Sequence, residues 1–384
     1  MIFQSLGSNY TLMSAFKILF SRGDKKDHQA VIKWLENHYG GIAYLYAKGR
    51  DGLAAAIEGI NASSVAVNGV TCSVLIDAVQ HAGSNVIYID IANDGNLRLS
   101  ELDKSLRSAQ PPRAIIIQNT YGNTCDIAKI ESLAKKHKAI IIEDLAHCLG
   151  QKYPDGREVG TVGDIVMLSF GRDKIIDVVN GGALIIREPL FLKKIKGPSE
   201  IRPARNQIQD RFYPILTWLA RRTYRIGLGK LIVYAMYKFH LAEHSADGGI
   251  HPEYDMPDWQ AHYLLGELEK LSQNLDHRTK IATIYREQLS ELIPTENASL
   301  RVPLLVRGRQ KLIEYLAENH YLLADTWYDT PIGPKRKYQK IDYPEDTNKN
   351  SIQLARHIIN LPTHVNINER QARKLATLIK EYYD

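Results

Sequence analysis

The sequence predicts an α/β protein in which a large domain with a mostly parallel sheet is followed by a smaller α+β domain. The chain has 384 residues, which is enough for two domains. Between about residues 45 and 190, short apolar runs alternate with stretches of helical character. These runs are rich in Ile and Val and scarcely alternate with polar residues, which is typical of strands that helices cover on both faces.

The large domain is predicted to contain six strands and the helices that connect them. The predicted strands are Ser64–Asn68, Asn85–Asp90, Arg113–Asn119, Ala139–Asp144, Asp164–Phe170 and Ala183–Arg187. The predicted helices are Gly52–Ile60, Cys72–His81, Ser100–Ser108 and Ile127–His137. Strands that alternate with helices in this way predict parallel pairing, because each helix returns the chain to the same edge of the sheet.

The pattern changes after Gly248–Gly249. Leucines recur at helical spacing between residues 264 and 271, which predicts one or two amphipathic helices over Gln260–Leu289. The remaining predictions are a strand near Leu300–Val306, a helix near Gln310–Asn319, a polar loop near Asp342–Asn350 and a terminal helix Glu369–Tyr382. We place the domain boundary near residue 250, so the predicted domains are 1–250 and 251–384.

Composition and cysteine usage predict a cytoplasmic protein without metal. Apolar residues make up 44% of the chain and charged residues 24%, as in ordinary globular proteins. The three cysteines, Cys72, Cys125 and Cys148, are too few and too dispersed for a disulfide framework or a zinc site. We expect no signal peptide, because Gly7, Ser8 and Asn9 interrupt the first apolar residues. No apolar run approaches the ~18 residues that cross a bilayer.

The excess positive charge is concentrated in one segment. The net charge is +6, yet Phe191–Ser245 alone holds eleven basic residues against Glu200, Asp210 and Glu243. Residues 203–245 interleave these basic residues with aromatic ones. Three interpretations remain open: a helical pair packed on the large domain or at a dimer interface, an amphipathic element on an anionic membrane, and a grip on a phosphorylated substrate. Nucleic-acid binding is not expected, since no recognised motif accompanies the charge.

Polar residues stand at the ends of two predicted strands. Asp144 ends one strand, and Ser169 lies near the end of the next, five residues before Lys174. In parallel α/β sheets, ligands bind beyond the carboxyl ends of the strands. A cofactor that carries amino groups needs a lysine for its aldehyde and an acid for its pyridine nitrogen. Lys174 and Asp144 therefore predict a site for pyridoxal 5'-phosphate (PLP).

Glycine and hydroxyl residues near other helix starts predict the phosphate site of the same cofactor. Gly49 precedes a helix predicted to begin near Gly52, and Thr71 opens the helix after Ser64–Asn68. A helix start presents free backbone N–H groups, which bind phosphate.

Longer strings carry a family pattern. The string "IIEDLAHCLG" (141–150) contains Asp-x-Ala-His, and "GTVGDIVMLSFGRDKIIDVVNGGALI" (160–185) contains Ser-Phe, a lysine and Gly-Gly in the same order. With "GRDGLAAAI" (49–57) and "VTCSVLIDAVQHAGSNVIYIDI" (70–91), they resemble the DegT/StrS family of PLP-dependent aminotransferases of fold type I. This family is best known for aminating keto groups on nucleotide-linked sugars, and the resemblance covers most of the chain.

The resemblance implies a fold-type-I PLP-transferase, with a mostly parallel seven-stranded sheet, that forms a homodimer with sites at the subunit interface. It implies three catalytic residues. Lys174 would be the Schiff-base lysine and proton carrier, Asp144 would pair with the pyridine nitrogen, and His147 would contact the 3-hydroxyl group.

The resemblance also implies further cofactor-binding residues. Ser169 and the backbone around Gly49 and Arg50 would hold the phosphate, while Thr71 and Cys72 belong to the segment that covers the ring. Many relatives carry an aromatic residue at the position of Cys72, so stacking on the ring is expected to be weaker here.

We therefore expect an aminotransferase that moves an amino group, from glutamate, to a nucleotide- or lipid-linked keto-sugar in glycan or secondary-metabolite biosynthesis. One alternative is a PLP-dependent sugar dehydratase or lyase, which Lys174 opposes because dehydratase relatives carry histidine there. Another is a non-catalytic, membrane-associated descendant of the fold. Residues 203–245 support it, as does "EYDM" (253–256), which stands where many relatives have Asn-Tyr-Arg-Met.

Overall fold

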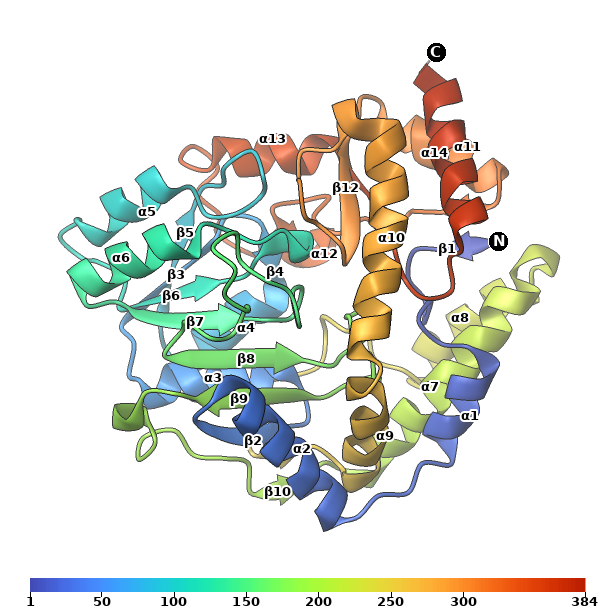
Figure 1. The fold of residues 1–384 in the computed structure, drawn as a ribbon. Coiled ribbons are helices and arrows are strands. Elements are labelled where there is room, and N and C mark those ends of the chain that lie inside the picture. Colours follow the sequence, from blue (N-terminus) through green and yellow to red (C-terminus); the bar gives the residue numbers. More distant parts are fainter. Residues whose placement is uncertain (384) are drawn as a thin grey trace.

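A seven-stranded sheet forms the centre of the computed structural model, which describes residues 1–383 (Figure 1). Of the seven strands, β9 runs antiparallel to both neighbours, and the others share one direction. The predicted mostly parallel, seven-stranded sheet is thus confirmed. In spatial order the strands are β2 (Ile42–Tyr46), β9 (Gly182–Ile186), β8 (Ile165–Ser169), β7 (Ile140–Asp144), β6 (Ala114–Ile117), β3 (Ser64–Asn68) and β5 (Asn85–Ile89).

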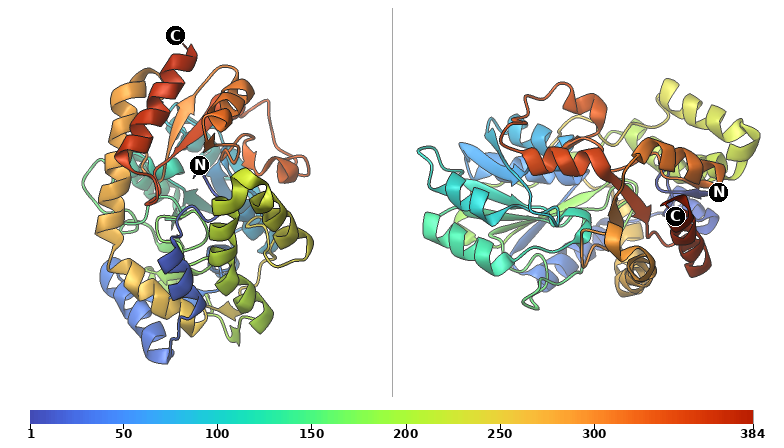
Figure 2. Two further views of the ribbon diagram at one scale, coloured as in Figure 1. Left: turned by 90° about the vertical axis from the view of Figure 1, so that its right-hand side faces the viewer. Right: turned by 90° about the horizontal axis from the view of Figure 1, so that it is seen from above.

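Helices cover both faces of this sheet (Figure 2). The helices α3 (Gly49–Gly59) and α4 (Ser73–His81) share an apolar core with one face. The other face packs against α2 (Lys25–Tyr39), α5 (Leu99–Leu106), α6 (Ile127–His137) and α9 (Asp258–Leu268). Strands β3, β6, β7 and β9 are buried along their whole length, which explains why their central residues form short apolar runs.

The carboxyl ends of the parallel strands meet at one edge of the sheet, and β9 begins at that edge. Ser169, the last residue of β8, pairs with Gly182, the first residue of β9. Asp144, the last residue of β7, pairs with Met167 of β8. This register brings the polar strand ends side by side, where α/β proteins bind ligands.

The C-terminal part contains the smaller elements that the sequence predicts. The antiparallel strands β12 (Arg301–Leu305) and β15 (Ile358–Pro362) share a core with α10 (Leu271–Leu289), α11 (Arg309–Glu318) and α14 (Glu369–Tyr383). The N-terminal strand β1 (Ile2–Phe3) pairs with β13 (Tyr321–Leu322). The division of the chain near residue 250 stays a prediction.

Residues 203–245, which carry much of the excess positive charge, contain a helical hairpin. This agrees with the interpretation of the segment as a helical pair packed on the large domain or at a dimer interface. Its helices are α7 (Ala204–Thr223) and α8 (Leu228–Lys238), and α7 also packs against α1 (Leu12–Leu19). Tyr213 of α7 and Met236 of α8 share a small apolar cluster with Val179 and Trp259. The hairpin is thereby fixed to the rest of the chain. Within residues 1–383, no helix is both long enough and apolar enough to span a membrane.

Several elements differ from the sequence predictions. The edge strand β2 and the helices α1 and α2 were not expected. The segment predicted as a polar loop near Asp342–Asn350 ends earlier, because α13 (Lys349–His357) begins within it. Asp90 explains this start, since its carboxylate accepts hydrogen bonds from the backbone N–H groups of Asn350 (3.1 Å) and Ser351 (2.9 Å). The helix predicted to begin near Gly52 begins at Gly49.

Candidate active site

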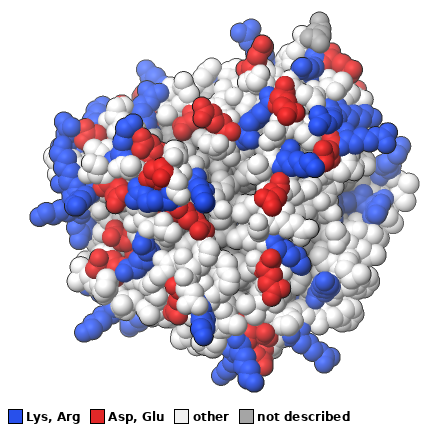
Figure 3. All heavy atoms as spheres, viewed as in Figure 1, with Lys and Arg blue, Asp and Glu red and all other residues white. Residues whose placement is uncertain are grey.

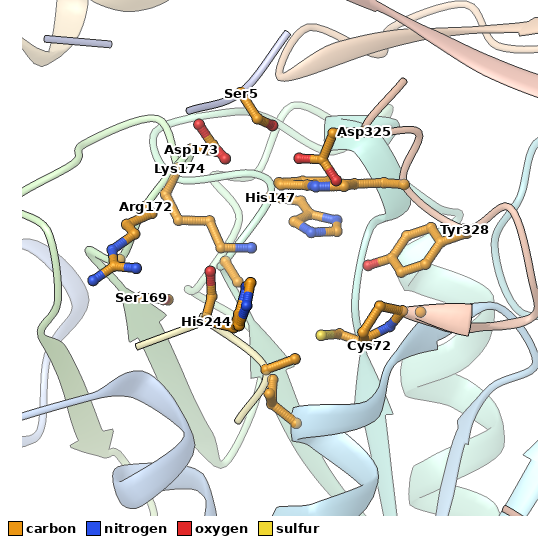
Figure 4. Close-up of a pocket in the computed structure, with 18 of the residues that line it drawn as sticks. Ser5, Cys72, His147, Ser169, Arg172, Asp173, Lys174, His244, Asp325 and Tyr328 are labelled. Carbon is orange, nitrogen blue, oxygen red and sulfur yellow. The ribbon is translucent and has the colours of Figure 1, made fainter. Parts of the chain in front are cut away.

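One cavity of about 780 Å³ lies at the strand-end edge of the sheet. Every cofactor or catalytic residue that the sequence indicates lines it: Gly49, Arg50, Thr71, Cys72, Asp144, His147, Ser169 and Lys174. Figure 4 shows Lys174 extending into this cavity, with His147, Cys72 and Tyr328 beyond its amino group. The structure therefore brings the whole set together in one cavity.

Lys174 reaches the cavity from the loop between β8 and β9. Burial lowers the pKa of its amine, while Cys72 and Asp144 partly oppose this shift. The Nζ atom lies 4.7 Å from the ring centroid of Trp327, so an aromatic face rather than water covers it on that side. A lowered pKa increases the neutral fraction of the amine, which is the form that attacks a carbonyl carbon.

The buried carboxylate of Asp177 organises the loop that carries Lys174. It accepts hydrogen bonds from the backbone N–H groups of Asp173 (2.9 Å) and Val179 (3.0 Å). It also accepts from the side-chain amide of Asn9 (2.9 Å) and the hydroxyl of Tyr10. Asp173 and Val179 both have left-handed backbone conformations, with φ of 63° and 75°. Since such conformations are strained in residues other than glycine, the four bonds hold a loop that would otherwise relax.

Asp144 presents a largely unpaired carboxylate to the cavity. The backbone N–H of Ala146 donates to its Oδ1 atom (2.8 Å), and Oδ2 has no hydrogen-bond partner within residues 1–383. Burial raises the pKa of Asp144 to about 6, although Ala146 and Lys174 act in the opposite direction. A buried acid with a free oxygen is stabilised by a cationic N–H donor, as a pyridinium ring would supply.

His147 is held as a neutral hydrogen-bond donor. Burial, Lys174 and Arg301 all lower its pKa, so the ring is uncharged near neutral pH. The backbone N–H of Tyr121 donates to Nδ1 (3.3 Å), which leaves the ring proton on Nε2. The ring stacks on Trp327 with centroids 5.2 Å apart. In this tautomer the Nε2–H group can donate to an oxygen such as that of the 3-hydroxyl group of PLP.

The start of α3 lies unusually close to the sheet because two glycines meet there. A Cβ atom on Gly182 would lie 2.3 Å from the Cα of Gly49, so only glycine is tolerated at this position. The residue before the helix, Lys48, makes no side-chain capping bond. The first N–H groups of α3 are thus left for an anion at the cavity wall.

Basic side chains surround this helix start. Arg50 donates to the backbone carbonyls of Gly248 (2.8 Å) and Ser245, which follow α8. Arg172 donates to the carbonyl of Glu243 (2.6 Å) and stacks over the ring of Tyr213 at 3.7 Å. Lys48 also lines the cavity, and burial lowers its pKa. The region therefore combines a helix N-terminus with positive charge, as a phosphate requires.

Thr71, Cys72 and Ser169 line the remaining walls. Thr71 and Cys72 form the short strand β4, which pairs with β14 (Ile332–Gly333), so Thr71 does not open the helix as predicted. The Thr71 hydroxyl donates to Gln118 and keeps its lone pairs as acceptors. Cys72 is partly buried, and Ser169 ends β8.

The structure adds cavity residues that the sequence analysis did not identify. Tyr213, Tyr224 and Tyr237 come from the α7–α8 segment, and Trp327 comes from the C-terminal part. The spacing of Asp177, three residues after Lys174, was a local signal for a residue that organises the loop. No comparable signal exists for Trp327, because it meets His147 only through the tertiary fold.

The residues present fit PLP. The cavity offers an amine, an unpaired buried acid, a neutral imidazole donor and an anion site at a helix start, and these match the aldehyde, pyridine nitrogen, hydroxyl and phosphate of PLP. Among residues 1–383, no group of three or more His, Cys, Asp or Glu side chains is arranged for a metal ion.

Comparisons with known proteins agree with this fit. A family model described as the DegT/DnrJ/EryC1/StrS aminotransferase family matches residues 49–380. The GDP-perosamine synthase of Escherichia coli O157:H7 is 25% identical over 320 residues, which cover 80% of this chain and 76% of that protein.

Two solved structures share the fold. Helicobacter pylori PseC, an aminotransferase involved in the biosynthesis of pseudoaminic acid, has a TM-score of 0.70 at 17% identity, covering 96% of this chain and 95% of that one. DesV from S. venezuelae has a TM-score of 0.72 at 18% identity, covering 97% and 95%. The chain therefore belongs to the DegT/DnrJ/EryC1/StrS aminotransferase family and is a PLP-dependent aminotransferase of fold type I.

Proposed function

We propose that this aminotransferase moves an amino group from glutamate to a keto-sugar that is linked to a nucleotide. The name of the GDP-perosamine synthase relative supports a nucleotide-linked sugar. The cavity, at about 780 Å³, exceeds the space that PLP alone needs, and tyrosines line the part next to α7 and α8. Aromatic rings and basic side chains are the groups that bind sugars and phosphates.

The observation that carries the proposal is that Lys174 and Asp144 line the same cavity, on neighbouring segments at the strand-end edge. PLP, when bound, supplies an aldehyde and a ring that withdraws electrons from the carbon bearing the amino group. Asp144 would keep the ring nitrogen protonated, which would maintain that withdrawal. His147 would hold the ring's hydroxyl oxygen through its Nε2–H group.

Lys174 takes the role of proton carrier. Its amine has a lowered pKa and lies in a cavity wall where Trp327 shields it from water. With PLP bound, the neutral amine would act as the general base toward the α-carbon of glutamate. In its protonated form it would act as a general acid, and the same two roles would serve the half-reaction in which the keto-sugar receives the nitrogen.

We further propose that the enzyme is a cytoplasmic homodimer in glycan or secondary-metabolite biosynthesis, with peripheral membrane contact through residues 203–245. The family resemblance supports the dimer, and the absence of a paired-cysteine pattern supports a reducing compartment.

Absorption spectroscopy tests the assignment of Lys174. Purified protein with PLP is expected to show the visible band of PLP bonded to a lysine, and glutamate should bleach that band. Lys174→Ala should lose the band and turnover, whereas Lys129→Ala, at an exposed surface position, should keep both. Retention of the band and of amino transfer in Lys174→Ala would refute the role. Keto-sugar nucleotides, added to the bleached enzyme, should restore the band.

A further inference from the structure

The helical hairpin and α1 expose large apolar side chains in stripes. On α8 these are Leu228, Leu231 and Tyr234, which recur every three residues and therefore lie along one side of the helix. On α7 they are Ile208, Phe212 and Leu219, and Phe239 and Leu241 follow α8. Helices α7 and α8 pack against each other (Figure 2), so these exposed side chains come from neighbouring helices.

Helix α1 extends this region on the other side of α7. Met13, Phe16 and Phe20 are exposed, and the rings of Phe16 and Phe20 stack in parallel at 6.3 Å. Scattered single apolar residues are normal on protein surfaces, but neighbouring stripes on three helices are not. We call these exposed apolar residues, with the basic residues among them, the apolar–basic surface.

Every exposed charged side chain on α1 and in the hairpin Ala204–Lys238 is basic: Lys17, Arg205, Arg222, Arg225, Lys230 and Lys238. The one acidic residue in Ala204–Lys238, Asp210, is buried and forms an ion pair with Arg202. Where the hairpin comes into view at the right-hand edge of Figure 3, the surface is white and blue. The surface thus combines apolar area with positive charge.

Basic groups also lie close to aromatic rings on this surface. Lys238 lies 5.0 Å from the ring centroid of Tyr234, and Arg222 lies 5.6 Å from that of Trp218. Such pairs place an aromatic ring and a cation at the same depth, as at the boundary between lipid headgroups and acyl chains.

The charge of the apolar–basic surface distinguishes between two possible partners, a second copy of the chain and a lipid bilayer. A second copy docked through the same face would oppose basic residues to basic residues, because a two-fold interface is self-complementary. An anionic bilayer supplies the opposite charge and accepts the apolar side chains, and no helix in residues 1–383 could span the membrane instead. We propose that the apolar–basic surface docks this protein onto an anionic lipid bilayer as a peripheral membrane protein.

The docked orientation places the active site at the membrane surface, a step that rests on the proposed function. Helix α8 carries Leu231 and Tyr234 on its outer side, while Val233 and Tyr237 line the catalytic cavity. One helix therefore faces lipid on one side and the cavity on the other. Docking brings the cavity wall to the level of the headgroups.

Vesicle flotation tests the proposal with the full chain. Vesicles of phosphatidylcholine mixed with phosphatidylglycerol should carry the protein upward, and vesicles of phosphatidylcholine alone should carry far less. Raising the salt concentration should reduce the bound fraction on anionic vesicles, because salt screens the attraction.

Two double variants separate the apolar and charged contributions. Leu231→Ser with Phe239→Ser changes side chains that are 60% and 65% exposed, and should weaken vesicle binding at least tenfold. Lys230→Gln with Lys238→Gln should weaken binding roughly 25-fold on anionic vesicles, at about fivefold for each lysine. The matched control, Leu190→Ser with Lys129→Gln, changes an exposed leucine and lysine elsewhere and should bind like the wild type.

The bound-PLP band, recorded on the same samples, shows that each variant is folded and separates failure of docking from failure of the proposed function. The proposal is overturned if the wild type stays unbound on anionic vesicles, or if the Leu231→Ser, Phe239→Ser variant binds as the wild type does. It is equally overturned if light scattering shows that this variant separates a dimer of the wild type into monomers, since the surface would then be an interface between copies.

Discussion

Asp144 occupies an environment that opposes its own charge. Burial raises its pKa to about 6 from the reference value of 3.8, so folding favours the protonated form. In the absence of a cationic partner, the folded chain binds a proton more tightly than the unfolded chain does. Stability from this group therefore falls as pH rises from about 4 to 6 and stays low above that window.

Asp144→Asn is expected to stabilise the cofactor-free protein at neutral pH. The amide cannot ionise, so the variant avoids a cost of roughly 3 kcal/mol at pH 7, and the gain disappears near pH 4. Urea unfolding of both proteins at the two pH values measures the difference. The same variant should lose amino transfer, because an amide does not keep the ring nitrogen protonated. An equal gain at both pH values would contradict this account.

Asp177 acts on Lys174 through the loop. Asp177→Asn keeps the shape of the side chain but replaces one acceptor oxygen with an NH₂ group, so it cannot satisfy the N–H groups of both Asp173 and Val179 as well as Asn9. We expect a loss of about 2–4 kcal/mol in stability and weaker PLP binding. A titration of the visible band with PLP measures the affinity, and an unchanged affinity would show that the loop holds its shape without this carboxylate.

Local sequence was sufficient for most of these residues. Asp144 and Ser169 end neighbouring strands, and Lys174 follows Ser169 by five residues, so the sheet topology brings the three to one edge. Burial, Lys174 and Arg301 lower the pKa of His147, and the backbone N–H of Tyr121 selects its tautomer. These neighbours meet His147 only in the folded chain, so no local pattern indicated them.

At the scale of elements, the close approach of α3 to the sheet depends on Gly182, which has no side chain. Gly182 opens β9 directly beneath Gly49, and a Cβ atom there would collide with backbone atoms of α3. Helix α3 can therefore direct its N-terminus at the cavity only while position 182 is glycine.

Gly182→Ala is expected to displace the start of α3 and weaken PLP binding at least tenfold, with a stability loss of about 1–3 kcal/mol. The matched control is Gly266→Ala in α9, where a Cβ atom would meet open space and alanine favours the helix by about 1 kcal/mol. Thermal unfolding and the PLP titration compare the two. If Gly182→Ala binds PLP like the wild type, the close approach is not what forms the phosphate site.

Most strands of the large sheet were predictable, including β5 at one edge, whereas β2 at the other edge was not. The strands β3, β6, β7 and β9 are buried on both faces and contain apolar runs of three or more residues. Strand β2 lies at the edge of the sheet with a mixed burial pattern and was missed, although "IAYLY" (42–46) is itself an apolar run. The start of α13 depends on the carboxylate of Asp90, a tertiary contact that no local pattern encodes.

Across the whole molecule, the candidate catalytic residues come from one chain. Lys174 and Asp144 line the same cavity without help from a second subunit. Mixed dimers of Lys174→Ala and Asp144→Asn subunits, formed by unfolding and refolding together, should therefore stay inactive, since each site lacks one of its two groups. Recovery of amino transfer in the mixture would show that the two residues meet across a subunit interface.

Trp327 also allows binding in the cavity to be followed by tryptophan fluorescence. The chain has four tryptophans, and this one stacks on His147 and lies 4.7 Å from the amine of Lys174. A chromophore bonded to that amine would lie within contact range of the indole and quench its emission. Loss of intrinsic fluorescence on adding PLP, absent in Trp327→Phe, would report occupancy in real time without any label.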